Sequence, residues 1–83
     1  MAKGESFIYE LGVVGLGYVG LPLAVESANQ NLSVLGFDID ESRVQQINTG
    51  NSPIEDVSNE ELASALKNFV ASFDSSKLAD CKN

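Results

Sequence analysis

The sequence predicts an α/β fold, in which three parallel strands form a sheet flanked by helices. Short runs rich in β-branched and aromatic residues alternate with segments in which apolar residues recur at helical spacing. A glycine-rich bend over residues 15–20 joins the first strand to the first helix, and an acid, Asp38, ends the second strand. Such alternation builds parallel sheets, because each strand-to-strand crossover runs through a helix.

The first predicted strand covers residues 7–15, F-I-Y-E-L-G-V-V-G, and runs directly into a glycine. The first predicted helix covers residues 18–30. Pro22 must lie near its start, because a proline deeper inside would break the helix. The apolar residues that recur at helical spacing in this segment are Val19, Leu23, Ala24 and Ala28.

The second predicted strand covers residues 33–38. Asp40 is expected to cap a short helix over residues 41–49, because its side chain can accept a hydrogen bond from a free amide of the first turn. Gly50 is the expected stop of that helix, since glycine tolerates the left-handed conformation that commonly ends helices.

The third predicted helix covers residues 59–67 and begins with a capping box, in which Ser58 and Glu61 each satisfy a free amide near the other. A third strand, F-V-A-S-F, is predicted at residues 69–73, and a weak helical turn follows from Ser75. The predicted order is therefore β-α-β-α-α-β-α.

Composition excludes several classes of function. The net charge of −7 argues against a nucleic-acid surface, which needs clustered Lys and Arg. The single cysteine, Cys81, leaves no internal disulfide, and the lack of histidine removes the commonest general base and metal ligand. No apolar run could span a bilayer, and residues 1–6 lack the apolar run of a signal peptide. We therefore expect a cytoplasmic protein without a membrane partner.

The bend G-L-G-Y-V-G at residues 15–20 fits the pattern G-x-G-x-x-G, which is weak by itself. Its context strengthens it, because a strand precedes the bend, a helix follows, and Asp38 lies 18 residues after Gly20. That separation is typical of the ribose-binding acid in a Rossmann dinucleotide-binding unit. The sequence thus predicts a partial Rossmann fold, with strand order 3-2-1 and truncated before strand 4.

Each glycine of the bend has a mechanical reason. Gly15 permits the tight turn out of the strand, Gly17 lets a pyrophosphate approach the backbone, and Gly20 lets the helix pack close to the strand. The amides of Tyr18 and Val19 are expected to point at the phosphates, helped by the helix dipole. Simple turn glycines are the alternative interpretation of the same residues.

Asp38 is expected to accept hydrogen bonds from the adenosine ribose hydroxyls and to repel a 2′-phosphate, so NAD is favoured over NADP. By residue type alone, Arg43 is an ordinary surface charge. Glu55 and Asp56 form an acidic pair, but without histidine a solvated loop is favoured over a metal or acid–base site. Cys81 lies in a polar tail without a base to activate it.

Two runs, G-V-V-G-L-G-Y-V-G-L-P-L-A-V-E at 12–26 and V-L-G-F-D-I-D-E-S-R-V at 34–44, resemble the amino terminus of the UDP-glucose/GDP-mannose dehydrogenase family. The segment P-I-E-D-V-S-N-E-E-L at 53–62 is similar to members acting on UDP-N-acetylhexosamines. Members of this family oxidise the C6 alcohol of a nucleotide sugar to a carboxylate in two NAD-dependent steps, through a thiohemiacetal on cysteine. The resemblance implies an NAD-dependent UDP-sugar 6-dehydrogenase that makes polysaccharide precursors.

The resemblance matches the family's ribose-binding acid to Asp38 and its basic residue beside the adenosine to Arg43. The family's V-P-T-P loop, its central helical segment and its UDP-sugar domain have no counterpart here, so no catalytic residue is carried over. Cys81 does not match the family's nucleophile. The predicted cofactor-binding residues are Gly15, Leu16, Gly17, Tyr18, Val19, Gly20, Asp38, Ile39 and Arg43.

Residues 1–83 are therefore expected to form a single domain, the amino-terminal half of a dinucleotide-binding domain. An open edge on the first strand predicts a homo-oligomer formed through residues 8–14. The chain is expected to bind ADP-ribose about as well as NAD and to show no turnover. Two alternatives remain, a different Rossmann enzyme and a stand-alone nucleotide-binding module. The Leu21-Pro22 continuation argues against the first of them.

Overall fold

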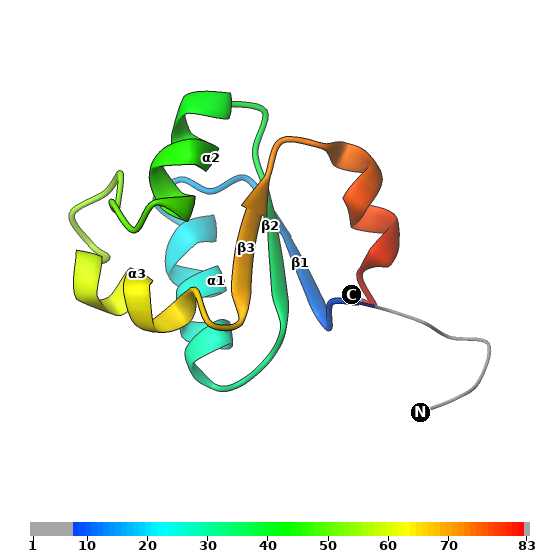
Figure 1. Ribbon diagram of the computed structural model, residues 1–83, viewed down its shortest axis with the longest axis horizontal. Coiled ribbons are helices and arrows are strands. Elements are labelled where there is room, and N and C mark those ends of the chain that lie inside the picture. The colour runs from blue at the N-terminus through cyan, green and yellow to red at the C-terminus, as the bar shows by residue number, and fades with distance from the viewer. Residues whose placement is uncertain (1–7, 83) are drawn as a thin grey trace.

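The computed structural model describes residues 8–82 (Figure 1). Three parallel strands form one sheet of order β1-β2-β3, with Leu11 opposite Val34 and Val34 opposite Phe69. The predicted fold class and strand order are confirmed. The elements are β1 (Leu11–Val14), α1 (Gly20–Asn29), β2 (Val34–Phe37), α2 (Glu41–Asn48), α3 (Asn59–Ala65), β3 (Phe69–Ser72) and the 3₁₀ helix η1 (Ser75–Asp80).

The helices α1, α2 and α3 lie on one side of the sheet, and η1 lies on the other (Figure 1). Right-handed crossovers explain this, because the chain moves from β1 to β3 in one direction and then returns across the opposite face. The core lies between the sheet and the three α-helices. Its members with the least exposed side chains are Leu16, Leu21, Ala24, Val34, Ile47, Leu62 and Ala65.

The predicted caps of α2 and α3 and the glycine stop after α2 are confirmed. The Asp40 side chain accepts a hydrogen bond of 3.1 Å from the Arg43 amide and caps α2. Gly50 follows the end of α2 with a φ of +88°. Ser58 and Glu61 form the predicted capping box of α3, with hydrogen bonds of 3.0 and 2.9 Å.

All six predicted strands and α-helices are shorter in the structure, and the first strand and the first helix differ most from their predicted bounds. The strand expected over residues 7–15 is limited to β1, because the amides of Glu10 and Leu11 both donate to the Ser33 carbonyl and break the regular ladder. Phe7 lies outside the described residues. The helix expected from residue 18 begins at Gly20, since residues 18 and 19 belong to the bend.

The buried face of α1 also differs from the predicted one. Val19 and Leu23 are 84% and 52% exposed, although both recur at helical spacing. Of the predicted residues, Ala24 and Ala28 are buried. The buried face consists of Leu21, Ala24, Val25 and Ala28.

The described chain ends beside the start of β1. Cys81 forms an isolated parallel bridge with Tyr9, and the Lys82 amide donates to the Tyr9 carbonyl at 2.9 Å. The sequence did not indicate this pairing, which leaves β1 itself bonded to β2 alone among the described strands. Over residues 8–82, every helix is too short or too polar to cross a membrane.

Candidate functional site

The bend after β1 is anchored by the side chain of Leu16, which is fully buried. Gly36, in the middle of β2, makes room for it, because a Cβ on Gly36 would lie 2.7 Å from Leu16 Cδ2. On either side of this anchor the bend faces outward, with Tyr18 71% exposed. Leu16 can therefore serve a ligand only through its backbone. The role of Gly36 was not predicted, although a glycine inside a strand often marks such a close approach.

The three glycines of the bend differ in their surroundings. Gly15 has a φ of +90°, a conformation that favours glycine. A Cβ on Gly20 would lie 1.6 Å from the Gly15 carbonyl oxygen, so the start of α1 touches the bend. A Cβ on Gly17 would meet only Arg43 Nη1, at 3.8 Å. The predicted mechanical roles of Gly15 and Gly20 match this geometry, and Gly17 leaves its peptide open to an approaching group.

Asp38 joins the bend to the start of α2. Its Oδ2 accepts a hydrogen bond from the Leu16 amide at 2.9 Å, and its Oδ1 accepts one from the Asp40 amide at 2.9 Å. The residue is only 9% exposed, and its own amide donates to the Ser72 carbonyl at 3.1 Å. The acid and the glycine bend, 22 positions apart in the chain, are thus in direct contact.

These contacts keep Asp38 ionised. Burial alone raises the pKa of the carboxyl, but the amide hydrogen bonds from Asp40 and Leu16, together with the charge of Arg43, outweigh it. The pKa of Asp38 is therefore lowered from its ordinary value. An ionised carboxylate offers about four acceptor positions, so two amide bonds leave capacity for further donors.

The amino end of α1 has no side-chain cap and no acid in its first turn. In contrast, Asp40 caps α2, Ser58 caps α3 and Asp74 caps η1. The amides of Tyr18 and Val19 meet no acceptor within residues 8–82. Unpaired amides at a helix amino terminus favour an anion, because the helix dipole adds to their own partial charge.

Arg43 lies in the first turn of α2, and its Nη1 is 3.6 Å from Asp38 Oδ2. Its side chain is 37% exposed. Ile39, which follows Asp38, is 85% exposed and projects away from the core. The structure therefore brings Gly15, Leu16, Gly17, Gly20, Asp38 and Arg43 together. Tyr18, Val19 and Ile39 stand exposed on the same two loops.

A hollow of about 530 Å³ opens at the bend. Backbone forms much of its wall, since four glycines contribute to it. The lining residues are Gly12, Val13, Val14, Gly15, Gly17, Tyr18, Val19, Gly20 and Leu23. Open backbone, unpaired amides and a nearby ionised carboxylate fit the diphosphate and ribose of a dinucleotide.

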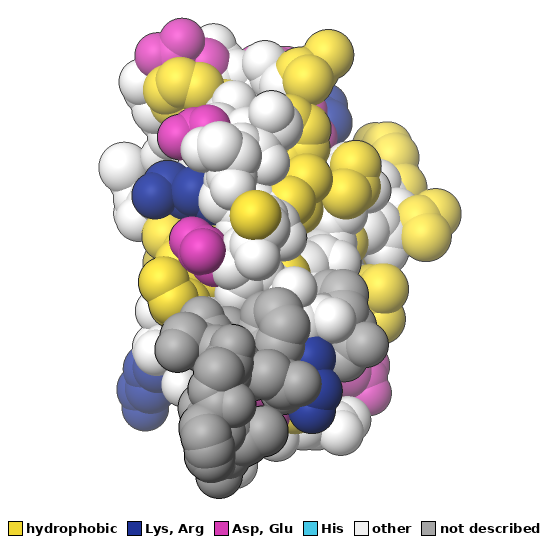
Figure 2. Space-filling view, turned by 90° about the vertical axis from the view of Figure 1, so that its right-hand side faces the viewer, with side chains coloured by type: hydrophobic (Ala, Val, Ile, Leu, Met, Phe, Trp, Pro, Cys, Tyr) yellow, Lys and Arg dark blue, Asp and Glu magenta, His cyan; other side chains and the backbone are white. Residues whose placement is uncertain are grey.

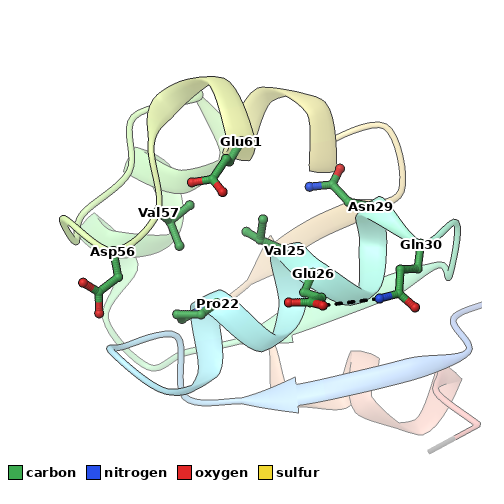
Figure 3. Close-up of a pocket in the computed structure, with 8 residues that line it drawn as sticks. All are labelled: Pro22, Val25, Glu26, Asn29, Gln30, Asp56, Val57 and Glu61. Carbon is green, nitrogen blue, oxygen red and sulfur yellow. Dashed lines mark hydrogen bonds between the residues drawn. The ribbon is translucent and has the colours of Figure 1, made fainter.

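A second cavity, of about 320 Å³, lies between α1 and α3 (Figure 3). Its polar side chains include Glu26, Asp56 and Glu61, and Glu26 accepts a hydrogen bond from Gln30 across one helical turn. Over the described residues, no group of acids and cysteine is arranged to hold a metal ion. Glu55 and Asp56 are both exposed in the loop before α3.

Cys81 is partly buried near the end of η1. Burial, and then the charge of Asp80, raise the pKa of its thiol. The thiolate, which is the nucleophilic form, is therefore disfavoured at neutral pH.

The chain is similar to one family of known proteins. The model of the UDP-glucose/GDP-mannose dehydrogenase family, NAD binding domain, matches residues 9–82. A UDP-N-acetyl-D-mannosamine dehydrogenase of Methanococcus maripaludis is 45% identical over 53 residues, which are 64% of this chain and 12% of that protein. A UDP-N-acetyl-D-glucosamine 6-dehydrogenase of Pseudomonas aeruginosa is 51% identical over 41 residues, which are 49% of this chain and 10% of that protein.

Among solved structures, the fold matches a GDP-mannose dehydrogenase from Pseudomonas aeruginosa, determined as a ternary complex. The TM-score is 0.78 at 27% sequence identity, and the match covers 86% of this chain and 17% of that one. The chain thus spans only a small share of the proteins that it matches.

Proposed function

Because this chain belongs to the UDP-glucose/GDP-mannose dehydrogenase family and matches its NAD-binding domain, we propose that its glycine bend, Asp38 and Arg43 hold the ADP half of the cofactor NAD. The observation that carries this proposal is the 2.9 Å hydrogen bond between the Leu16 amide and Asp38 Oδ2. This contact supports the proposal because it joins the acid to which we assign the ribose directly to the bend to which we assign the phosphates. The chain would then be the amino-terminal half of a dinucleotide-binding domain.

Each group of residues in the site would bind a different part of the cofactor. The unpaired amides of Tyr18 and Val19 bind the pyrophosphate, and the open peptide at Gly17 lets it approach. The free acceptor positions of Asp38 take the ribose hydroxyls, while its amide bonds hold the carboxylate in place. The exposed side chain of Ile39 offers an apolar surface to the adenosine. When bound, NAD supplies the hydride acceptor of the oxidation.

We further propose that the whole protein is an NAD-dependent UDP-sugar 6-dehydrogenase of the cytoplasm. It would convert the C6 alcohol of a UDP-N-acetylglucosamine-like sugar, or of UDP-glucose, to the uronate for polysaccharide precursors. The names of two relatives support a UDP-N-acetylhexosamine. The catalytic groups of such an enzyme are not among the candidate residues of this chain, so we expect residues 1–83 to bind NAD without turnover.

Calorimetric titration tests this assignment. We expect the chain to bind ADP-ribose and NAD with similar, weak affinity, because the bend and Asp38 contact only their shared half. Asp38→Ala should weaken both ligands about tenfold or more, since hydrogen bonds to a charged group contribute about 1.5–3 kcal/mol. The assignment fails if the variant binds as well as the wild type, or if NAD binds much more tightly than ADP-ribose.

We also propose that two copies associate through the edge of β1. The opposite edge is blocked at Ala71, because the Asn48 side chain donates to the Ala71 carbonyl at 2.8 Å and accepts from the Ala71 amide at 3.0 Å. On the other edge, residues 80–82 bond to the backbone of Ile8 and Tyr9 only, and β1 beyond them carries Val14, which is 68% exposed. Seen from the η1 side, hydrophobic side chains gather along one flank of the molecule (Figure 2).

An apolar strand edge with unpaired backbone groups can pair with a strand of another chain, and a charged side chain on the edge disfavours such pairing. Val14→Lys should therefore reduce self-association in sedimentation equilibrium, whereas the matched change Val70→Lys in β3 should not. The β1 proposal fails if the wild-type chain stays monomeric at high concentration, or if both variants behave alike.

A further inference from the structure

The helix α1 has two flanks that face different parts of the molecule. Pro22, Val25 and Asn29 line the cavity that α1 shares with α3 (Figure 3). Val19 and Leu23, four positions apart on one side of the start of the helix, line the hollow at the glycine bend instead. That hollow therefore lies on the flank of α1 that is turned away from α3.

The same stretch of β1 forms a wall of this hollow and the open edge of the sheet. Residues 12–14 contribute to the wall, and β1 is bonded to β2 alone among the described strands. The backbone bonds from residues 80–82 reach only Ile8 and Tyr9, so they leave residues 11–14 uncovered. An uncovered edge strand presents N–H and C=O groups that can bond to another strand. A strand that pairs with β1 would therefore stand beside the bend, over the hollow.

Exposed apolar side chains surround the hollow. Val14 is 68%, Val19 84% and Leu23 52% exposed, and all three line it. A diphosphate is bound by amides rather than by such side chains, whereas exposed apolar patches mark sites of protein contact. A second copy of the chain fits this surface, because it carries the same open edge and the same apolar side chains. Two identical edges that pair about a twofold axis form a closed dimer.

We propose that nucleotide binding and self-association exclude each other at this hollow, so that the nucleotide dissociates the dimer and the dimer weakens nucleotide binding. This inference rests on the proposed function, because it needs the diphosphate at the bend and a second copy at β1. The wall that the second copy would cover includes the backbone that the diphosphate would approach. Since linkage is reciprocal, each binding event weakens the other by the same factor.

The size of the effect follows from mass action. At a chain concentration roughly tenfold above the dimer dissociation constant, about one fifth of the chains are monomeric, so the apparent affinity for ADP-ribose should be about fivefold weaker than at high dilution. Conversely, ADP-ribose at roughly ten times its own dissociation constant should weaken the dimer about a hundredfold, because each of its two chains contributes a factor of about eleven.

Sedimentation equilibrium with and without ADP-ribose tests the exclusion without any substitution. We expect the ligand to convert wild-type dimers to monomers, and sodium chloride at the same ionic strength to leave the dimers unchanged. In calorimetry, the apparent affinity of the wild type for ADP-ribose should fall as the chain concentration rises. Val14→Lys should remove this dependence on concentration, whereas the matched change Val70→Lys in β3 should preserve it. Circular dichroism checks that both variants are folded.

The outcomes separate the exclusion from the proposals on which it rests. A wild-type chain that does not bind ADP-ribose at any concentration refutes the proposed function. A chain that binds ADP-ribose but stays monomeric overturns the exclusion together with association through β1. Dimers that persist or become tighter at saturating ADP-ribose overturn the exclusion alone. A concentration dependence that survives Val14→Lys and is lost in Val70→Lys also overturns it, because the dimer would then form at β3.

Discussion

Replacement of Gly20 and of Gly17 by alanine should separate folding from binding within one bend. A Cβ on Gly20 would lie 1.6 Å from the Gly15 carbonyl oxygen and 2.8 Å from the Gly15 carbonyl carbon. Both are backbone atoms, so the start of α1 must move away from the bend. A Cβ on Gly17 would lie 3.8 Å from the flexible end of Arg43, which is ordinary contact.

The expected magnitudes follow from these distances. Overpacking of this kind lowers the free energy of unfolding by about 1–3 kcal/mol or more. The higher helix propensity of alanine relative to glycine offsets up to about 1 kcal/mol of this loss. We therefore expect Gly20→Ala to lower the free energy of unfolding by about 2 kcal/mol, or the Tm by roughly 8–16 °C. Gly17→Ala should stay within about 0.5 kcal/mol of the wild type.

Urea denaturation followed by circular dichroism measures the stabilities, and calorimetry with ADP-ribose measures binding. Gly17→Ala should bind at least about tenfold more weakly, because its methyl group would stand where we propose that the pyrophosphate approaches the peptide. The reasoning is refuted if Gly20→Ala is as stable as the wild type. It is also refuted if Gly17→Ala binds normally or unfolds as readily as Gly20→Ala.

Three further predictions concern Asp38, the α3 cap and the blocked sheet edge. Burial raises the pKa of Asp38, but the amide hydrogen bonds outweigh burial and lower this pKa below the ordinary value of 3.8. The ionised carboxylate therefore stabilises the fold fully above pH 3.8, and this stabilisation is lost as the pH falls through the lower pKa of the folded state. The difference in unfolding free energy between wild type and Asp38→Asn, measured in urea, should shrink over that pH range, and a constant difference would contradict the prediction. Ser58→Ala should cost about 1 kcal/mol in urea and leave ADP-ribose affinity unchanged. Asn48→Ala should cost about 1–3 kcal/mol and increase self-association in sedimentation, because it frees the Ala71 amide and carbonyl.

Local chemistry was predictable from the sequence. Asp40 and the Ser58–Glu61 box form their caps within three or four residues, so neighbouring sequence suffices to place them. The spacing from Gly20 to Asp38 also predicted which residues meet, because one strand–helix–strand crossover has a nearly constant length. The 2.9 Å contact between Leu16 and Asp38 is the result of that regularity.

Features set by tertiary packing were not predictable. The face of α1 that is buried depends on the residue at which the bend ends and the helix begins. Helical periodicity alone wrongly predicted that Val19 and Leu23 are buried. The anchoring of Leu16 against Gly36 joins residues 20 positions apart through side-chain shape, which residue type does not reveal. The Tyr9–Cys81 bridge joins the two ends of the described chain, and no pattern in the sequence near either residue indicates this pairing.

Amide chemical shifts during titration with ADP-ribose test the central claim most directly, because each peptide of the bend reports separately. We expect the largest changes at residues 15–20 and 38–43, with little change at Asp56 and Glu61 in the acidic cavity between α1 and α3. Shifts concentrated in that cavity, or no shifts at the bend at saturating ligand, would contradict the account.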